Sequence, residues 1–394
     1  MTTPEADDSL QFLSRRMRSI PPSGIRKFFD LIAETDDVIS LGIGEPSEVT
    51  PRPFIDAAIQ SLNAGNTRYT SNWGMSRLRE DLAAHIERLY GLRYDPQTEI
   101  LITSGSSEGL DIALRSLLDD GDEVLCADPS YVAYEPATLM AGGRFRGVPT
   151  HVENDFRLAG SELDDRATAR SKVLLLGYPT NPTGATLGRE DLLAIAEVVK
   201  RRNLAVVSDE LYDRLTYGQT HVSFPTLPGM RERTVLVGGF SKAYAMTGWR
   251  LGWVCAPAGM AEMLMRVHQY VMMSAPTMSQ AAGIAALELG EPYVEAMRTE
   301  YDRRRKLIVG GLRSLGLATF EPRGAFYAFP DIRSTGLTSA QFSEGLLTEE
   351  RVAVVPGDAF GPSGEGFVRC CYATSYEDIE RALERMGRFV ARRR

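Results

Sequence analysis

From about residue 98 onward, the chain alternates short apolar runs with longer stretches that have helical character, such as 191–202. Strands that are each followed by a helix of about a dozen residues form a mainly parallel sheet, and the helices cover both of its faces. The pattern therefore predicts an α/β architecture. Strands are expected within 99–105, 122–130, 171–177, 204–208 and 233–239.

The C-terminal third has a different pattern. A long helical stretch over 291–316 precedes several short apolar runs, and a last helix leads to the end of the chain. One long helix followed by a few strands is typical of a smaller α+β unit with its own sheet. Its strands are expected around 324–332, 351–360 and 367–375.

The composition favours a soluble protein that acts on small molecules. The 394 residues carry a formal net charge of −8, and they include no long run of Lys or Arg. This balance argues against nucleic acid or an anionic membrane surface as the main partner. No apolar stretch approaches the roughly 20 residues needed to span a bilayer. The four cysteines have no CxxC spacing and the four histidines are widely separated, so we expect a reducing, cytoplasmic compartment and no bound metal.

Small and polar residues follow directly after several of the expected strands. In open parallel sheets, ligands bind outside the carboxyl ends of the strands. Residues 104–109 form a turn that opens a helix, and its N–H groups suit an anion such as phosphate. An ordinary βα turn with a serine cap has the same pattern. Asn181 lies between two prolines after the third strand, and Asp209 follows the fourth, with Tyr212 three residues further on.

Lys242 follows the run 233–239, and Arg250 lies eight residues beyond it. The chain has only five lysines, so a lysine at the end of a buried strand is notable. Desolvation lowers the pKa of such a lysine and makes it a usable nucleophile and proton carrier. A buried Asp209 costs free energy unless it meets a cationic partner. The pattern suggests an enzyme that uses Lys242 as a covalent amine.

The segment GFSKAYAMTGWRLG resembles the pyridoxal-phosphate (PLP) attachment signature of class I and II aminotransferases. The likeness extends from about residue 18 to the last helix, and the chain most resembles the prokaryotic aspartate and aromatic aminotransferase branch. It implies PLP fold type I, with a large domain over 48–283 and a discontinuous small domain of 1–47 and 284–394. Further matching blocks are LGIGEPS (41–47), RYTSNWGMSRLRE (68–80), TSGSSEGL (103–110), NPTG (181–184), SDELY (208–212), GAFYAFP (324–330) and VRCCYATS (368–375).

The resemblance implies how the PLP ring would be held. Lys242 would bind the cofactor covalently and carry a proton to and from the substrate carbon. Asp209 would pair with the ring nitrogen and keep it protonated, so that the ring acts as an electron sink. Tyr212 and Asn181 would hydrogen-bond the ring oxygen, and Tyr131 would stack on the ring.

The resemblance also implies a phosphate site and a dimer. Ser106, Ser107 and Arg250 would bind the phosphate, and Ser241 would also be among the cofactor-binding residues. Many relatives have a serine where this chain has Gly239. Relatives build each active site at a dimer interface, so a homodimer is expected in which Tyr69 reaches the phosphate of the neighbouring subunit.

The implied activity is transfer of an α-amino group to a 2-oxo acid, with 2-oxoglutarate as the usual acceptor, in a ping-pong cycle. Arg369 would bind the substrate α-carboxylate through a planar fork, and Gly44 would offer its backbone nearby, with Tyr131 and Asn181 also at the substrate. The mostly apolar segment 20–31 resembles the piece that covers the site in relatives.

Two questions about the reaction stay open at this point. The apolar character of the covering segment favours an aromatic donor. If Arg115 met a second carboxylate, an aspartate-like donor would be favoured instead. The alternative activity is that of a PLP-dependent C–S β-lyase or a related carbanion enzyme on the same fold.

Overall fold

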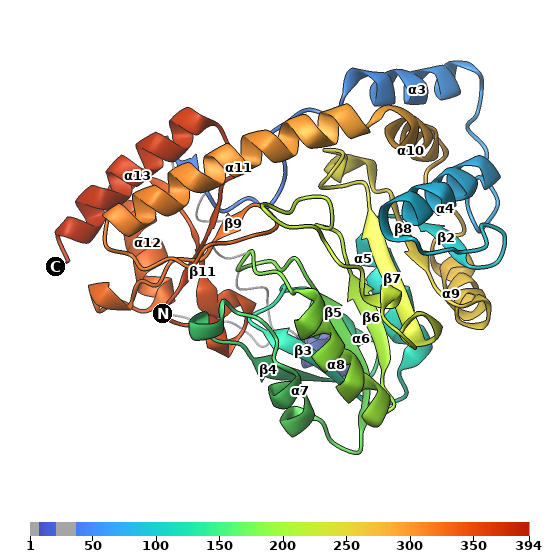
Figure 1. Ribbon diagram of the computed structural model, residues 1–394, viewed down its shortest axis with the longest axis horizontal. Helices are drawn as coiled ribbons and strands as arrows, with labels where there is room; N and C mark the ends of the chain where they lie inside the picture. Colours follow the sequence, from blue (N-terminus) through green and yellow to red (C-terminus); the bar gives the residue numbers. More distant parts are fainter. Residues whose placement is uncertain (1–7, 21–36, 394) are drawn as a thin grey trace.

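The computed structural model describes residues 8–20 and 37–393, and its largest element is a seven-stranded sheet (Figure 1). The strand order is β2-β8-β7-β6-β5-β3-β4, and within this sheet only β8 runs antiparallel to its neighbours. The predicted α/β architecture is confirmed. The strands are β2 (Ile100–Thr103), β3 (Glu123–Asp128), β4 (Arg144–Pro149), β5 (Ser171–Gly177), β6 (Ala205–Asp209), β7 (Thr234–Gly239) and β8 (Gly252–Cys255).

The five strands expected from the apolar runs are all present, whereas β4 and β8 were missed. β4 is an edge strand whose residues are mostly half-buried or exposed, with Arg144 and Arg146 among them, so it lacks a continuous apolar run. β8 has only four residues and begins ten residues after Lys242. Neither strand has the long, continuous apolar run by which a central parallel strand is recognised in a sequence.

Successive residues of the central strands are buried on opposite faces of the sheet. In β5, Val173 and Leu175 pack with one layer of helices, whereas Leu174 and Leu176 pack with the other. Both faces are covered, which is why these strands are apolar throughout. The first layer contains α5 (Ser106–Leu117), α6 (Tyr134–Met140) and α9 (Ala258–Val271). The second contains α3 (Arg52–Asn63), α4 (Ser76–Tyr90), α7 (Gly160–Arg166), α8 (Arg189–Arg201) and α10 (Thr277–Leu289).

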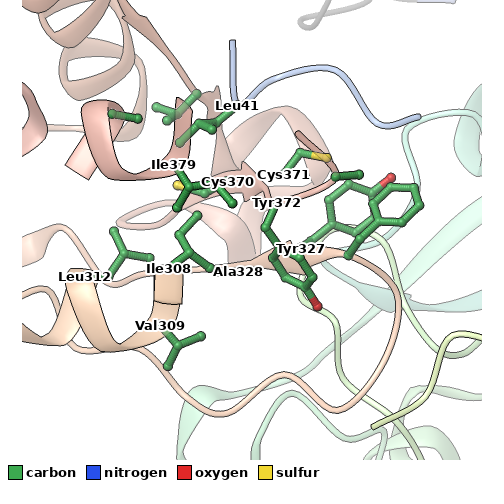
Figure 2. Close-up of a cluster of buried hydrophobic side chains, with 14 of the residues drawn as sticks. Leu41, Ile308, Val309, Leu312, Tyr327, Ala328, Cys370, Cys371, Tyr372 and Ile379 are labelled. Carbon is green, nitrogen blue, oxygen red and sulfur yellow. The ribbon is translucent and has the colours of Figure 1, made fainter. Parts of the chain in front are cut away.

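A second group of elements includes the long helix α11 (Glu291–Ser314), together with α12 (Ser339–Glu350) and α13 (Tyr376–Ala391). In Figure 1, α11 runs from α10 toward α12 and α13. These helices pack on a small antiparallel sheet of order β11-β12-β9. Figure 2 shows part of the shared core, including Leu312, Tyr327 and Ile379. The strands are β9 (Tyr327–Ala328), β11 (Val355–Pro356) and β12 (Val368–Cys371).

Residues from near the start of the chain join this second group. β1 (Ile39–Ser40) pairs in parallel with β10 (Val352–Ala353), and Leu41 belongs to the same apolar core. The short helix α1 (Arg15–Arg18) lies instead near α6, where Arg16 forms an ion pair with Asp120.

Two expectations can be compared with the structure only over the described residues. The covering segment 20–31 lies, apart from Ile20, outside the described residues. Across 8–20 and 37–393, no helix combines the length and the apolar character needed to cross a bilayer.

The core under α11 provides a test of this packing. Leu312 is fully buried, so Leu312→Ala should lower the free energy of unfolding by about 2–5 kcal/mol, because it removes buried methyl groups and leaves a cavity. Leu193 on α8 is 37% exposed, and Leu193→Ala should cost much less. Denaturant unfolding followed by circular dichroism measures both. Equal losses would contradict the assignment of Leu312 to the core.

Candidate active site

A cavity of about 420 Å³ lies at the carboxyl ends of β3, β5, β6 and β7. Tyr69 is 79% exposed and is not among the residues that line it. The other eleven predicted site residues all line the cavity, although they come from segments far apart in the sequence. They are Gly44, Ser106, Ser107, Tyr131, Asn181, Asp209, Tyr212, Ser241, Lys242, Arg250 and Arg369.

Lys242 brings its amine into this cavity. It follows β7, and its Nζ donates a hydrogen bond of 2.6 Å to the carbonyl oxygen of Gly44. Burial lowers the pKa of Lys242 to about 8, and the positive charges of Arg369 and Arg250 act in the same direction. Much of the amine is therefore neutral at mildly alkaline pH, as a nucleophile requires.

Asp209 is the last residue of β6, and it is a buried residue that lines the cavity. Its carboxylate accepts hydrogen bonds from the Tyr134 hydroxyl at 2.9 Å and from the Leu211 amide at 3.2 Å. Burial raises the pKa of Asp209 to about 6, and these two hydrogen bonds partly oppose the rise. A buried carboxylate with a raised pKa is stabilised when a cationic group binds against it.

The start of α5 forms the third wall of the site. The helix is capped by Gly105 at φ 79°, without a side-chain hydrogen bond, so the alternative of an ordinary serine cap is wrong. β8 packs so closely here that a Cβ on Gly252 would come within 2.5 Å of Ser106 N. The Arg250 guanidinium lies beside Gly105, where a Cβ would come within 2.7 Å of Arg250 Nη2. Free N–H groups and a cation therefore meet at one helix start, which suits a phosphate.

Arg369 lies on β12 and reaches the cavity from the second group of elements. Its Nη1 donates to Asn181 Oδ1 at 2.8 Å, and its Nη2 donates to Gly42 O at 2.6 Å. Its Nε is buried and has no hydrogen-bond partner among the described residues. The guanidinium carbon lies over the rings of Tyr327 and Phe360, at 4.6 and 4.8 Å from their centroids. A planar cation held in this way suits a carboxylate.

The sequence interpretation gave no role to two tyrosines that line the cavity. Tyr134 holds Asp209, and the Tyr327 hydroxyl is 2.8 Å from the Tyr212 hydroxyl. Tyr327 stands in the matching block 324–330, and Tyr134 lies three residues after Tyr131. Only the pairing of their hydroxyl groups distinguishes them from core aromatics, and pairing between distant residues leaves no local pattern.

Arg115 does not line the cavity. It lies on α5, where its Nε donates to Asp111 Oδ2 at 2.7 Å, one helical turn away. The structure therefore does not support Arg115 as a ligand for a second substrate carboxylate.

The fold and the cavity are those of an enzyme, and comparisons with known proteins identify its class. Residues 36–386 match the family model "Aminotransferase class I and II". The chain is 45% identical to the aspartate aminotransferase of Pyrococcus abyssi over 96% of this chain and 98% of that one. It is 44% identical to aromatic-amino-acid aminotransferase 2 of Thermococcus litoralis, with the same coverage.

A solved structure gives the same result. The aromatic aminotransferase from Pyrococcus horikoshii matches with a TM-score of 0.89 and 45% identity, over 94% of this chain and 99% of that one. The chain belongs to the class I and II aminotransferase family, and the protein is a transaminase of PLP fold type I.

The lowered pKa of Lys242 can be measured without cofactor. Acylation requires a neutral amine, so labelling of Lys242 should rise with pH to a midpoint near 8. Lys172 is the internal control, because the hydrogen bond to Asp122 raises its pKa above the usual value. Competitive labelling of both sites, read by peptide mass spectrometry, gives the two midpoints. A midpoint for Lys242 at or above that of Lys172 would contradict the assignment.

Proposed function

We propose that the protein is a PLP-dependent amino-acid aminotransferase, which moves an α-amino group to 2-oxoglutarate in a ping-pong cycle. One observation carries the proposal. A half-buried lysine, a buried carboxylate and two arginines line one cavity, and the two arginines lie in different surroundings. Arg250 lies beside the free helix start, whereas Arg369 lies over two aromatic rings.

The residues of the cavity fit PLP at each of its polar groups. The start of α5, together with Ser106, Ser107, Ser241 and Arg250, suits the phosphate. Asp209 needs a cationic partner in its buried position, and a protonated pyridine nitrogen supplies one. Tyr212 and Asn181 offer hydrogen-bond donors for the ring oxygen, and Tyr131 offers a ring for stacking. When bound, PLP supplies an electron sink for negative charge at the substrate α-carbon.

In this proposal, Lys242 is the residue that accepts and donates protons. Its lowered pKa lets the amine lose a proton near neutral pH, bind the cofactor and later accept and return the α-proton. The Gly44 carbonyl accepts a hydrogen bond from Lys242 Nζ and so holds the side chain in the cavity.

Arg369 orients the substrate by its α-carboxylate. The guanidinium is already fixed by Asn181, by the Gly42 carbonyl and by the two rings, so little rotamer freedom is lost on binding. The unpartnered Nε supplies a further donor for an anion. Gly44 also lines the cavity, and its lack of a side chain lets the substrate approach the backbone there.

We extend the proposal to a homodimer with shared active sites. Tyr69 is largely exposed and outside its own cavity, which supports a role at the phosphate of a second subunit. The core around Leu41 and α11 supports the discontinuous small domain of 1–47 and 284–394, beside a large domain of 48–283. The four cysteines are buried and unpaired, which supports a reducing compartment such as the cytoplasm.

The donor is an aromatic or aspartate-like amino acid. The named relatives include enzymes of both kinds. Ile43, Leu110 and Val132 give the cavity apolar surface, and this supports an aromatic side chain. Arg115 is paired with Asp111, which removes one argument for aspartate.

Replacing the lysine tests the core of this proposal. Wild-type protein with added PLP should develop a visible absorbance band that shifts when an amino-acid donor is added. Lys242→Ala should lose the covalent band and lose turnover, because no amine remains to bind the cofactor or move the proton. Lys306→Ala, at an exposed position on α11, is the matched control and should behave as wild type. A wild-type spectrum that PLP leaves unchanged would contradict the proposal.

A donor panel separates carboxylate binding from side-chain choice. With phenylalanine, tyrosine and aspartate against 2-oxoglutarate, Arg369→Ala should raise KM for every donor by a similar factor of about 10–100, the loss of a charged hydrogen-bond pair. Wild-type kcat/KM across the panel ranks the donors. A KM increase confined to one donor would contradict the role of Arg369, and pyruvate release from cystathionine without an oxo acid would favour a β-lyase.

A further inference from the structure

Tyr327 lies where three parts of the cavity meet. Its hydroxyl contacts the Tyr212 hydroxyl at 2.8 Å, and its ring face lies 4.6 Å from the Arg369 guanidinium. Its Oη is also so close to Gly44 that a Cβ there would come within 2.6 Å. The side chain is fully buried on β9, which pairs with the strand that carries Arg369. The position of this ring is therefore fixed relative to both the phenol and the guanidinium.

The two phenols share one hydrogen bond whose direction depends on what else the cavity holds. Each hydroxyl has a single proton to donate. Burial raises the pKa of both Tyr212 and Tyr327, so each keeps its proton at neutral pH. Within the described part of the chain, Tyr212 is the only hydrogen-bond partner of the Tyr327 hydroxyl. When Tyr212 donates its proton into the cavity, Tyr327 must therefore be the donor between the two.

The direction of this bond affects how well Tyr212 donates. A hydroxyl that accepts one hydrogen bond is polarised and becomes a stronger donor in the next. The effect is largest where water is excluded, and both side chains are buried. Tyr327 can thus strengthen the hydrogen bond from Tyr212 to an acceptor without touching that acceptor.

The ring of Tyr327 has a separate contact. The Arg369 guanidinium carbon lies over this ring at 4.6 Å from its centroid, and over the Phe360 ring at 4.8 Å. Cation–π contacts of this kind contribute more when the cation is desolvated, and Arg369 is buried. Removal of the Tyr327 ring would remove this contact and let the Arg369 guanidinium move, whereas removal of the hydroxyl alone would leave the contact in place.

We propose that Tyr327 is a positioning residue with two separable actions: its hydroxyl turns the Tyr212 proton toward the cofactor side of the cavity, and its ring holds Arg369 for the substrate α-carboxylate. The inference rests on the proposed use of PLP and of Arg369. It adds a link between the cofactor-binding and carboxylate-binding parts of the site.

Tyr327→Phe and Tyr327→Leu separate the two actions in the PLP-loaded enzyme. Tyr327→Phe should raise the pH midpoint of the visible band and weaken PLP binding, measured by fluorescence titration, by severalfold. A weaker donor at Tyr212 leaves more negative charge on the ring oxygen, and this favours the protonated form of the lysine linkage. KM for the donors should stay within about twofold of wild type, because the ring remains.

Tyr327→Leu should show the same midpoint shift together with a KM increase of about tenfold for all donors. Phe360→Leu provides an independent test of the ring contact should Tyr327→Leu fold poorly. It removes the other ring and leaves the phenol pair intact, so KM should rise with no shift of the midpoint.

Tyr372→Phe is the matched control. Tyr372 is also fully buried, and its hydroxyl donates to the Ala325 carbonyl oxygen at 3.3 Å, outside the cavity lining. This variant should leave the midpoint, PLP affinity and KM unchanged. A similar shift in Tyr372→Phe would mean that any buried hydroxyl has the same effect, and it would overturn the proposal.

The outcomes also distinguish this inference from the proposed function. A wild-type enzyme without a PLP band would overturn both. A normal wild type with an unchanged midpoint and PLP affinity in Tyr327→Phe would overturn the inference about the hydroxyl alone and leave the aminotransferase proposal intact. Equal KM increases in Tyr327→Phe and Tyr327→Leu would overturn the separation of the two actions.

Discussion

Desolvation at the carboxyl ends of the large sheet is the physical constraint on which the site depends. The same burial lowers the pKa of Lys242 to about 8 and raises that of Asp209 to about 6. Burial thus lets Lys242 lose its proton at mildly alkaline pH and leaves the Asp209 carboxylate in need of a cationic partner. The ends of β6 and β7 open into a cavity and not into bulk water because Gly44, Tyr327 and Arg369, from outside the large sheet, also line that cavity.

Three fixed groups surround the lysine, and each comes from a different kind of structure. The start of α5 offers backbone N–H groups, which the close packing of Gly252 against Ser106 holds in place. The end of β6 offers a carboxylate held by Tyr134. β12 offers a guanidinium that lies over two rings. The positions of all three are set by backbone packing and side-chain contacts within the described chain.

The small sheet contributes more than Arg369. Because β9 pairs with β12, Tyr327 and Arg369 enter the cavity together, and their side chains contact each other and Tyr212. The group of elements that carries β9 and β12 also includes β1, from near the start of the chain. Gly42 and Gly44 follow that strand and contact Arg369 and Lys242, so a single short segment connects both halves of the cavity.

The sequence alone predicted five of the seven strands of the large sheet, a long helix over 291–316 where α11 spans Glu291–Ser314, and eleven of the residues that line the cavity. These were accessible because buried strands are apolar and ligands bind at the carboxyl ends of parallel strands. The edge strand β4 was missed because most of its residues are half-buried or exposed, and the antiparallel β8 was missed because it is only four residues long. The roles of Tyr134 and Tyr327, and the pairing of Arg115 with Asp111, were decided only by the tertiary structure. A hydrogen bond between distant side chains depends on how helices and strands pack together, and a local pattern of residues carries no record of it.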